Sequence, residues 1–477
     1  MKKKSMIGLA RWITDKYIYV MLGVFPLFWG GGYPNITEPK ALFFYGATAL
    51  WLLCVLILGA LSALRREGFR PALRPVHWAL AAFLLLAAVS ALLSPWWQNS
   101  LLGAPSTNGK PRYDGFATLV CYGALFFGVS LLARPKRSYV WVMAGAAALC
   151  CLVAALQLLG FDPFGLYPSG TNYYDKFGAY SGAFLGTIGN IGLLGQYLCI
   201  VTPVTAVSGL RAKRRWERIY LLSAAALCLV ILAFSQAEAA YVGTLACVLV
   251  CVPVLLPTRK ARRAAGLCSV LAVLAGLAVL WFWPGQSGTL WEASRVLHGD
   301  IRDEFGSRRI EIWRGALALV PDRPLLGGGP GTFGERIDIS WSRFIEETGQ
   351  MRTAVVSNAH NLYLAYLVNN GALGLAAYLA CIACSAVTWV RGRFNGDYIG
   401  AAGCGLLCCM VQDFFCVALS LAAPVMWVVW ALMESGDARP EEETEEAAPP
   451  EEEPEAAPPE KTEGAAPPPE KEAAGAE

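Results

Sequence analysis

Many of the residues that could bind a ligand or take part in a reaction lie in one long segment, residues 285–358. It contains nine arginines and ten acids but no lysine. A guanidinium can bind two phosphate oxygens at once and stays charged, so arginine is favoured where a phosphorylated ligand is held. Solvated pairing with the acids of the same segment is the alternative for most of the nine, and it would stabilise little. They are Arg295, Arg302, Arg308, Arg309, Arg314, Arg323, Arg336, Arg343 and Arg352.

Two of these arginines, Arg309 and Arg314, flank Trp313 in the stretch SRRIEIWRGALALV. This stretch has apolar residues at helical spacing, namely Ile310, Trp313, Leu317 and Val320. The pattern predicts an amphipathic helix that lies on the outer face of a membrane. Because the phosphate of a lipid-linked ligand would lie at the same level, both arginines are predicted to contact an anionic head group.

His360 is the candidate base. Ser357 or Asn358 is predicted to cap a helix that begins here, which would place His360 in the first turn. A helix N-terminus disfavours the imidazolium and attracts anions, and both effects suit a neutral base beside a phosphate. An interfacial histidine without a chemical role is the alternative.

Small and polar residues follow along the same predicted helix. Gly371 and Gly374 fall on the face of His360, which predicts that a second helix packs closely there. Asn369 and Asn370 are predicted to hydrogen-bond to a neighbouring helix. The run GGGPG at 327–331 lacks the lysine and hydroxyl residue of a P-loop, so it is expected to be a turn or an anion-binding nest.

The elements that position these residues are predicted to be membrane helices. The chain has 56% hydrophobic and 16% charged residues, which excludes a soluble globular body. The sequence predicts an all-α polytopic membrane protein with about twelve spans of the length a bilayer requires. They lie near 17–33, 41–63, 77–95, 116–133, 139–159, 186–208, 219–236, 239–256, 266–284, 360–389, 398–412 and 415–433.

Basic residues predict the orientation of these spans, because cytoplasmic loops are enriched in lysine and arginine. Loops on one side hold most of them, whereas the short loops on the other side hold only Lys40, Lys110, Arg112 and Lys176. Both termini are therefore predicted to be cytoplasmic, with the N-terminal span a retained signal anchor. The segment 285–358 becomes a large extracytoplasmic loop, and its length indicates a functional role.

Two domains are predicted. Residues 1–435 form the transmembrane domain, and residues 436–477 form a disordered cytoplasmic tail rich in Glu, Pro and Ala. The tail could recruit a cytoplasmic partner. All cysteines fall in apolar stretches, and Cys404, Cys408 and Cys409 have no His or acid at zinc spacing. No metal, cofactor or nucleic-acid partner is predicted.

Four motifs together resemble the O-antigen ligase and polymerase superfamily. His360-Asn361 followed by Gly371 and Gly374 resembles the start of a late helix in that family, and SRRIEIWRGALALVPDRPLLGGGPGTF resembles its Arg-x-x-x-Trp helix and glycine turn. GTIGNIGLLGQYL and GKPRYDGF resemble an earlier span and an early outer loop. The resemblance extends in order over about residues 95–390.

The resemblance implies a GT-C-like, metal-independent, inverting glycosyltransferase. Such enzymes transfer a glycan from an undecaprenyl-pyrophosphate carrier to a hydroxyl on a glycan or lipid-linked acceptor, at the extracytoplasmic face of the cell membrane. It implies that His360 is the catalytic or acceptor-positioning histidine, that Arg309 holds the pyrophosphate, and that Arg314, Arg112 and Asn361 contribute to substrate binding. Membrane lipids are the other expected partners.

One position departs from the family pattern. Many relatives have an arginine in the corner before the eighth span, where this chain has Glu238. A carboxylate cannot bind the same phosphate, so another cation such as Lys176 would replace it, or the substrates would differ. Ligase and polymerase roles both remain open. A transporter or flippase of a lipid-linked or anionic solute is the alternative, although no two-fold hydropathy repeat is present.

Overall fold

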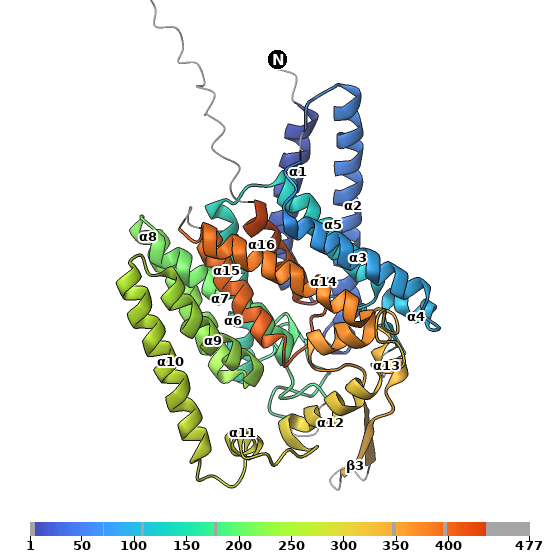
Figure 1. The fold of residues 1–477 in the computed structure, drawn as a ribbon, viewed down its shortest axis with the longest axis vertical. Helices are drawn as coiled ribbons and strands as arrows, with labels where there is room; N and C mark the ends of the chain where they lie inside the picture. The colour runs from blue at the N-terminus through green and yellow to red at the C-terminus, as the bar shows by residue number, and fades with distance from the viewer. Residues whose placement is uncertain are drawn as a thin grey trace, which may run out of the picture. The chain divides into compact units, whose positions relative to one another are not determined.

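The computed structural model is built almost entirely from helices (Figure 1). It describes residues 5–69, 71–105, 109–175, 179–345, 350–394 and 398–435, so Lys176 and the predicted tail lie outside the described residues. The helices that precede the long predicted loop are α1 (Met6–Tyr19), α2 (Thr37–Leu64), α3 (Pro75–Leu92), α4 (Trp97–Leu102), α5 (Phe116–Leu132), α6 (Arg137–Leu158), α7 (Ile191–Arg211), α8 (Arg215–Phe234), α9 (Glu238–Leu255) and α10 (Arg259–Trp281).

The long loop lies between α10 and α14 and has its own structure. It contains α11 (Thr289–Leu297), α12 (Phe305–Ala318), α13 (Phe333–Arg336) and an antiparallel hairpin of β3 (Ser340–Ile345) and β4 (Gln350–Val355). A second short hairpin, β1 (Phe184–Leu185) with β2 (Gly189–Asn190), precedes α7. The prediction of an all-α chain therefore missed two small hairpins. The final helices are α14 (Leu362–Gly392), α15 (Tyr398–Gln412) and α16 (Ala423–Ser435).

The prediction of a polytopic membrane protein is confirmed. Among the described residues, eight helices are long and apolar enough to cross a membrane, namely α2, α3, α6, α7, α8, α9, α10 and α14. Three apolar helices, α5, α15 and α16, are shorter. The total of about twelve spans stays a prediction, because length and composition do not decide it for the shorter helices.

Several helices begin at other residues than the predicted spans, and local sequence explains two of these differences. The first helix starts at Met6 rather than 17, where the Ser5 side chain accepts a hydrogen bond from the backbone N–H of Gly8. It then continues through a π-helical turn at Val20–Val24. The last helix starts at Ala423 rather than 415, next to Pro424, a residue that favours a first helical turn.

The core of the bundle is formed around α16. Trp427 and Trp430 are fully buried in this helix, and the Trp427 ring stacks on Tyr122 of α5 with a centroid distance of 5.2 Å. By contrast, α10 has no buried residue and lies at the edge of the bundle (Figure 1). The two helices that border the candidate site, α5 and α14, therefore rest on a large aromatic core.

Candidate functional site

His360 lies immediately before α14 rather than inside its first turn. Asn361 is the residue that caps the helix, because its Oδ1 atom accepts the backbone N–H of Leu364 at 2.9 Å. The predicted cap at Ser357 or Asn358 is therefore wrong. Asn358 instead accepts the backbone N–H of His360 at 3.0 Å, and His360 has a left-handed backbone with φ of 47°. This conformation is costly for a residue with a Cβ atom.

Two cations from distant parts of the chain act on this histidine. Burial, together with the positive charges of Arg309 and Arg112, lowers the pKa of His360 to about 4. The structure thus brings together three predicted site residues, from the loop before α5, from α12 and from the approach to α14. An imidazole in this setting is neutral near pH 7 and can accept a proton.

Arg112 is held rigidly beside the chain that leads to His360. Its Nη1 atom donates to Ser357 Oγ at 2.6 Å, and its Nε atom donates to Asp114 Oδ2 at 3.1 Å. Its side chain is only 10% exposed. Burial raises the pKa of Asp114, whereas Arg112 opposes that change. A guanidinium fixed by two partners is positioned in advance for an anionic ligand.

Arg309 differs from the other arginines of the long loop. Arg295, Arg302, Arg308 and Arg314 pair with acids, while Arg323 and Arg336 donate to backbone oxygens. These contacts confirm the solvated-pairing alternative for four of them. Arg309 donates through Nη1 to Gly306 O at 2.8 Å, but its buried Nε atom has no partner among the described residues. A buried donor without a partner indicates a place for a ligand oxygen.

Arg314 and Asn361, both predicted to bind substrate, are engaged by other groups of the protein. Arg314 pairs with Asp303 at 2.7 Å, and its side chain is 59% exposed. The Oδ1 atom of Asn361 is occupied by its capping bond. Arg314 therefore points to a surface carboxylate, and Asn361 fixes the start of α14 directly after His360.

Helix α12 forms where the sequence predicts it, but it buries a different face. Gly306, Ser307 and Arg308 have left-handed backbones, so the regular helix begins at Arg309. Ile312 and Ala316 are buried, whereas Leu317, which the predicted stripe includes, is 54% exposed. The packing partners of the helix come from α13, β3 and α14, which periodicity alone cannot identify.

Trp313 connects α12 to the site. Its Nε1 atom donates to the backbone oxygen of Ala359 at 3.0 Å, one residue before His360. The indole thus ties the helix that carries Arg309 to the chain that carries His360. The Arg-x-x-x-Trp pattern of the sequence has a direct positioning function here.

The glycines of α14 serve a purpose that the sequence did not indicate. Gly371 has φ of 71° and ψ of 179°, and it breaks the helix. The segment 324–329 of the long loop lies in this break, where Gly328 and Gly329 donate backbone N–H groups to the oxygens of Val368 and Asn369 at 3.0 and 2.8 Å. The predicted helix packing at Gly371 is wrong, because its close neighbour is the loop backbone of Leu325.

The same contacts decide between the two interpretations of the glycine run and favour the turn. The N–H groups of Gly328 and Gly329 are already used by α14, so these two residues do not form an anion nest. They satisfy backbone oxygens that the helix break exposes, which membrane-spanning helices require. Arg336 assists by donating to Val368 O at 2.9 Å and to Leu319 O at 3.1 Å.

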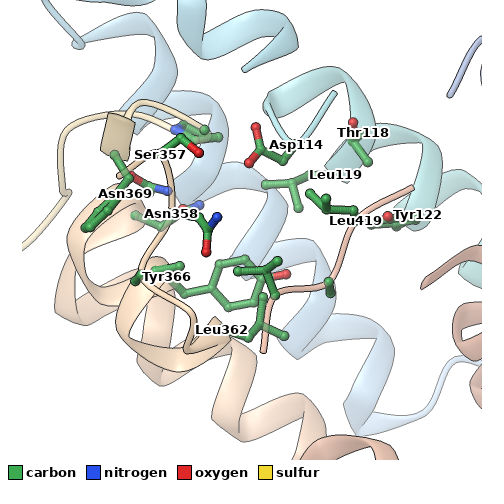
Figure 2. A pocket seen from close by; sticks show the side chains of 18 residues that line it. Asp114, Thr118, Leu119, Tyr122, Ser357, Asn358, Leu362, Tyr366, Asn369 and Leu419 are labelled. Carbon is green, nitrogen blue, oxygen red and sulfur yellow. The ribbon is translucent and has the colours of Figure 1, made fainter. Parts of the chain in front are cut away.

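A pocket lies beside these residues, between α5, α14 and the chain that leads to α16 (Figure 2). Figure 2 shows Ser357 and Asn369 on one side and Asp114 and Thr118 on the other. Asn369 Oδ1 and Asn370 Nδ2 are buried in its lining without a partner among the described residues, so the predicted hydrogen bonds of these amides to a neighbouring helix are wrong for these atoms. Ser90 of α3 reaches only the backbone oxygen of Asn369.

The sequence analysis missed several residues of this site. Asp114 and Tyr122 line the pocket, and Ser357 and Asp114 hold Arg112. Asp114 follows closely after Arg112 in the motif GKPRYDGF, which is a signal that could have identified it. Tyr122 has no such signal, since its neighbours in sequence are apolar span residues.

The corner at Glu238 has a local partner. The Oγ1 atom of Thr289, at the start of α11, donates to Glu238 Oε1 at 2.7 Å. This contact joins the start of α9 to the long loop. In the part of the chain that the structure describes, no group of three or more His, Cys, Asp or Glu residues is suited to hold a metal ion.

A comparison with protein families gives an independent result. Residues 221–379 match the family model described as O-antigen ligase (Wzy_C). The match contains Arg309 and His360 but ends before α15, and it does not include Arg112. No curated protein matches the chain significantly. The predicted resemblance to the O-antigen ligase and polymerase superfamily is therefore confirmed over this part of the chain.

Proposed function

We propose that this chain, in which residues 221–379 form an O-antigen ligase family domain, transfers a glycan from an undecaprenyl-pyrophosphate carrier to a hydroxyl of a glycan or lipid-linked acceptor. The family match supports a glycosyl-transfer activity of the O-antigen ligase or polymerase type in polysaccharide biosynthesis. The single observation that carries the finer proposal is the grouping of a half-buried His360, whose pKa is lowered to about 4, with Arg309 and Arg112.

The proposed reaction is a single displacement. The acceptor hydroxyl oxygen attacks the anomeric carbon, the bond from that carbon to the pyrophosphate oxygen breaks, and the electron pair leaves with the lipid pyrophosphate. His360 takes the hydroxyl proton as the new bond forms. One displacement inverts the anomeric configuration. Arg309 and Arg112 stabilise the charge that develops on the leaving pyrophosphate, a role that a metal ion fills in other enzymes.

The remaining parts of the proposal concern topology. The charge distribution of the loops supports both termini in the cytoplasm and the site on the extracytoplasmic face. The family resemblance implies a GT-C-like arrangement of the roughly twelve predicted spans. Arg314 and Asn361 have weaker support as direct ligands, because one pairs with a surface acid and the other caps α14.

Donor binding should change the protonation of His360. The two arginines lower its pKa in the free protein, and a bound pyrophosphate would offset their charge and raise that pKa. The acid limb of kcat/KM reports the free enzyme and should fall near pH 4, whereas the acid limb of kcat reports the complex and should lie at higher pH. Steady-state rates measured from about pH 3.5 to about pH 8, a range that contains both expected acid limbs, check this. Coincident limbs would contradict it.

Arg309 provides the direct test of the proposed site. Purified protein, given a lipid-pyrophosphate glycan and an acceptor, should release free carrier pyrophosphate, and a chelator should leave the rate unchanged. Arg309→Ala should slow this release by about 10²–10³-fold, as expected when a transition-state donor is removed. Arg302→Ala is the matched control, because Arg302 lies in the same loop but pairs with Asp300 at the surface. Equal rates in both variants would refute the proposed site.

One observation favours the transporter alternative. Helix α14 is broken at Gly371, and broken helices are common in transporters. However, the backbone groups at this break are paired with residues 324–329 rather than open to a solute. The release assay separates the two functions, because a transporter moves its solute without breaking the sugar–phosphate bond. Release in detergent, with no membrane to cross, would exclude transport as the explanation.

A further inference from the structure

Three arginines meet at the end of the bundle opposite His360. Helix α14 starts beside His360 and spans 31 residues, so its last turn lies roughly a bilayer thickness away from the candidate site. Arg393 directly follows that turn, Arg211 ends α7, and Arg262 lies in the first turn of α10. This end belongs to the predicted cytoplasmic face, so a ligand bound here is separate from the proposed glycan donor and acceptor.

Backbone oxygens hold the three side chains in place. The Nε atom of Arg393 donates to Val254 O at 3.0 Å, and the Nη2 atom of Arg211 donates to Arg393 O at 3.1 Å. Arg262 donates through Nη1 to two backbone oxygens of the loop before α10, both at 2.9 Å. Each guanidinium therefore has a fixed position, and each keeps further N–H groups that have no partner among the described residues.

Two of these positive charges lie against the same aromatic ring. The guanidinium carbons of Arg262 and Arg393 are 6.0 and 4.6 Å from the centre of the Phe394 ring. Cation–π contacts stabilise each arginine but do not neutralise it, so the two charges repel each other. An anion placed between them would offset this repulsion.

No carboxylate of the described residues neutralises the three arginines. None of the ion pairs there includes Arg211, Arg262 or Arg393. Glu217, the acid closest to Arg211 along the chain, pairs instead with Arg137 at 3.4 Å. The planar guanidinium groups match the paired oxygens of a phosphate. The same loops add further basic residues, namely Lys213, Arg214, Arg215, Arg218, Arg259, Lys260, Arg263 and Arg391.

An apolar groove between α14 and α15 begins at the same end of the bundle. Its lining includes Ile382, Ala386, Trp389, Leu406, Leu407 and Met410. Trp389 lies one helical turn before Arg393, and its Nε1 atom donates to Gly400 O at 3.2 Å. Arg211 Nη1 is so close to Gly400 that a Cβ atom there would be only 2.7 Å from it. The groove and the arginines therefore adjoin, as the chain and the phosphate of a lipid do.

We propose that this end of the bundle binds one anionic phospholipid. Its phosphate contacts Arg211, Arg262 and Arg393, and one acyl chain lies in the groove between α14 and α15. A free phosphate would leave the groove empty, and a zwitterionic lipid brings its own cation to a cluster that already has three. The lipid also joins the start of α10 to the end of α14, whereas α10 has no buried residue of its own.

Native mass spectrometry of the full-length protein in a neutral detergent tests the site, because it counts the lipid molecules bound to each protein. The probes are dioleoyl phosphatidylglycerol, dioleoyl phosphatidylcholine and glycerol 3-phosphate, each titrated separately. The wild type should bind one phosphatidylglycerol more tightly than either other probe. Equal affinity for the two lipids would overturn the proposal, and so would glycerol 3-phosphate that binds as tightly as phosphatidylglycerol.

Arg262→Ala tests the charge cluster. It should weaken phosphatidylglycerol binding about fivefold, the contribution of one basic residue near an anionic lipid. Arg65→Ala is the matched control, because it removes the same charge from the same predicted face at the end of α2. The control should bind as the wild type does. An equal loss in both variants would mean that the general positive charge of this face explains binding, and the proposed site would be wrong.

Ala386→Phe tests the groove and leaves the three arginines unchanged, so it decides the question even if Arg262→Ala does not fold. Ala386 is an exposed residue of the groove, and the added ring should weaken binding of the dioleoyl lipid about tenfold because chain methylenes lose their contacts. Ala275→Phe makes the same change on α10, away from the groove, and should have no effect. Full affinity in Ala386→Phe would refute the site. None of these measurements depends on glycan transfer, so their failure is distinct from failure of the proposed function.

Discussion

Replacement of His360 by alanine is expected to slow glycan transfer by about 10²–10⁴-fold, the usual contribution of a positioned general base. The imidazole is half-buried and its pKa is lowered to about 4, so it is neutral and able to accept the proton of an acceptor hydroxyl at pH 7. The rate of carrier pyrophosphate release by purified protein measures the effect. The amount of the variant in the membrane should equal that of the wild type, because α14 is capped by Asn361 rather than by His360.

His360→Gly provides a sharper form of the same experiment. Glycine adopts the left-handed backbone of this position without strain, so this variant should fold at least as well as the alanine variant. Added imidazole should then restore part of the rate, since the cavity left by the ring admits it. His298→Ala is the control, because His298 lies in the long loop and stacks on Trp281 at the end of α10. A fully active His360→Gly, or an inactive His298→Ala, would contradict a base at His360.

Substitution of Gly371 by leucine is expected to remove most folded protein from the membrane. Its backbone, with φ of 71° and ψ of 179°, is one that essentially only glycine adopts, and a non-glycine residue there costs about 1–3 kcal/mol. A Cβ atom would also collide with the backbone of Leu325, and such overpacking costs typically about 1–3 kcal/mol more. The two costs together approach the total stability of many domains.

Size-exclusion chromatography of detergent extracts measures this effect as the yield of monodisperse protein. Gly276→Leu is the matched control, because Gly276 lies in α10 with open space around its Cα atom and an ordinary helical backbone. We expect the control to behave as wild type. If Gly371→Leu also yields normal monodisperse protein, the docking of residues 324–329 into the break of α14 is wrong.

Much of the architecture could be predicted from the sequence, since long apolar runs predict membrane helices. The positions of α2, α3 and α6–α10 follow from hydropathy. The long loop between α10 and α14 follows from the lack of a long apolar run in that part of the sequence. The importance of Arg309, Trp313 and His360 could also be inferred, because residue type and local spacing carry that information. Boundaries were less certain, as at Met6 and Ala423, because capping groups rather than hydropathy decide them.

The sequence by itself determined that this is a polytopic membrane protein with a long loop rich in arginine and a histidine beside a helix start, and its motifs indicated the O-antigen ligase superfamily. Only the tertiary structure decided which arginines act together, because the charge of Arg112 reaches His360 across 248 positions of the chain. It also decided that Gly371 is a helix break filled by a loop, and that Asn369, Asn370 and Tyr122 face one pocket. Local patterns report on neighbours along a helix, whereas these contacts join segments whose spacing in sequence carries no periodic signal.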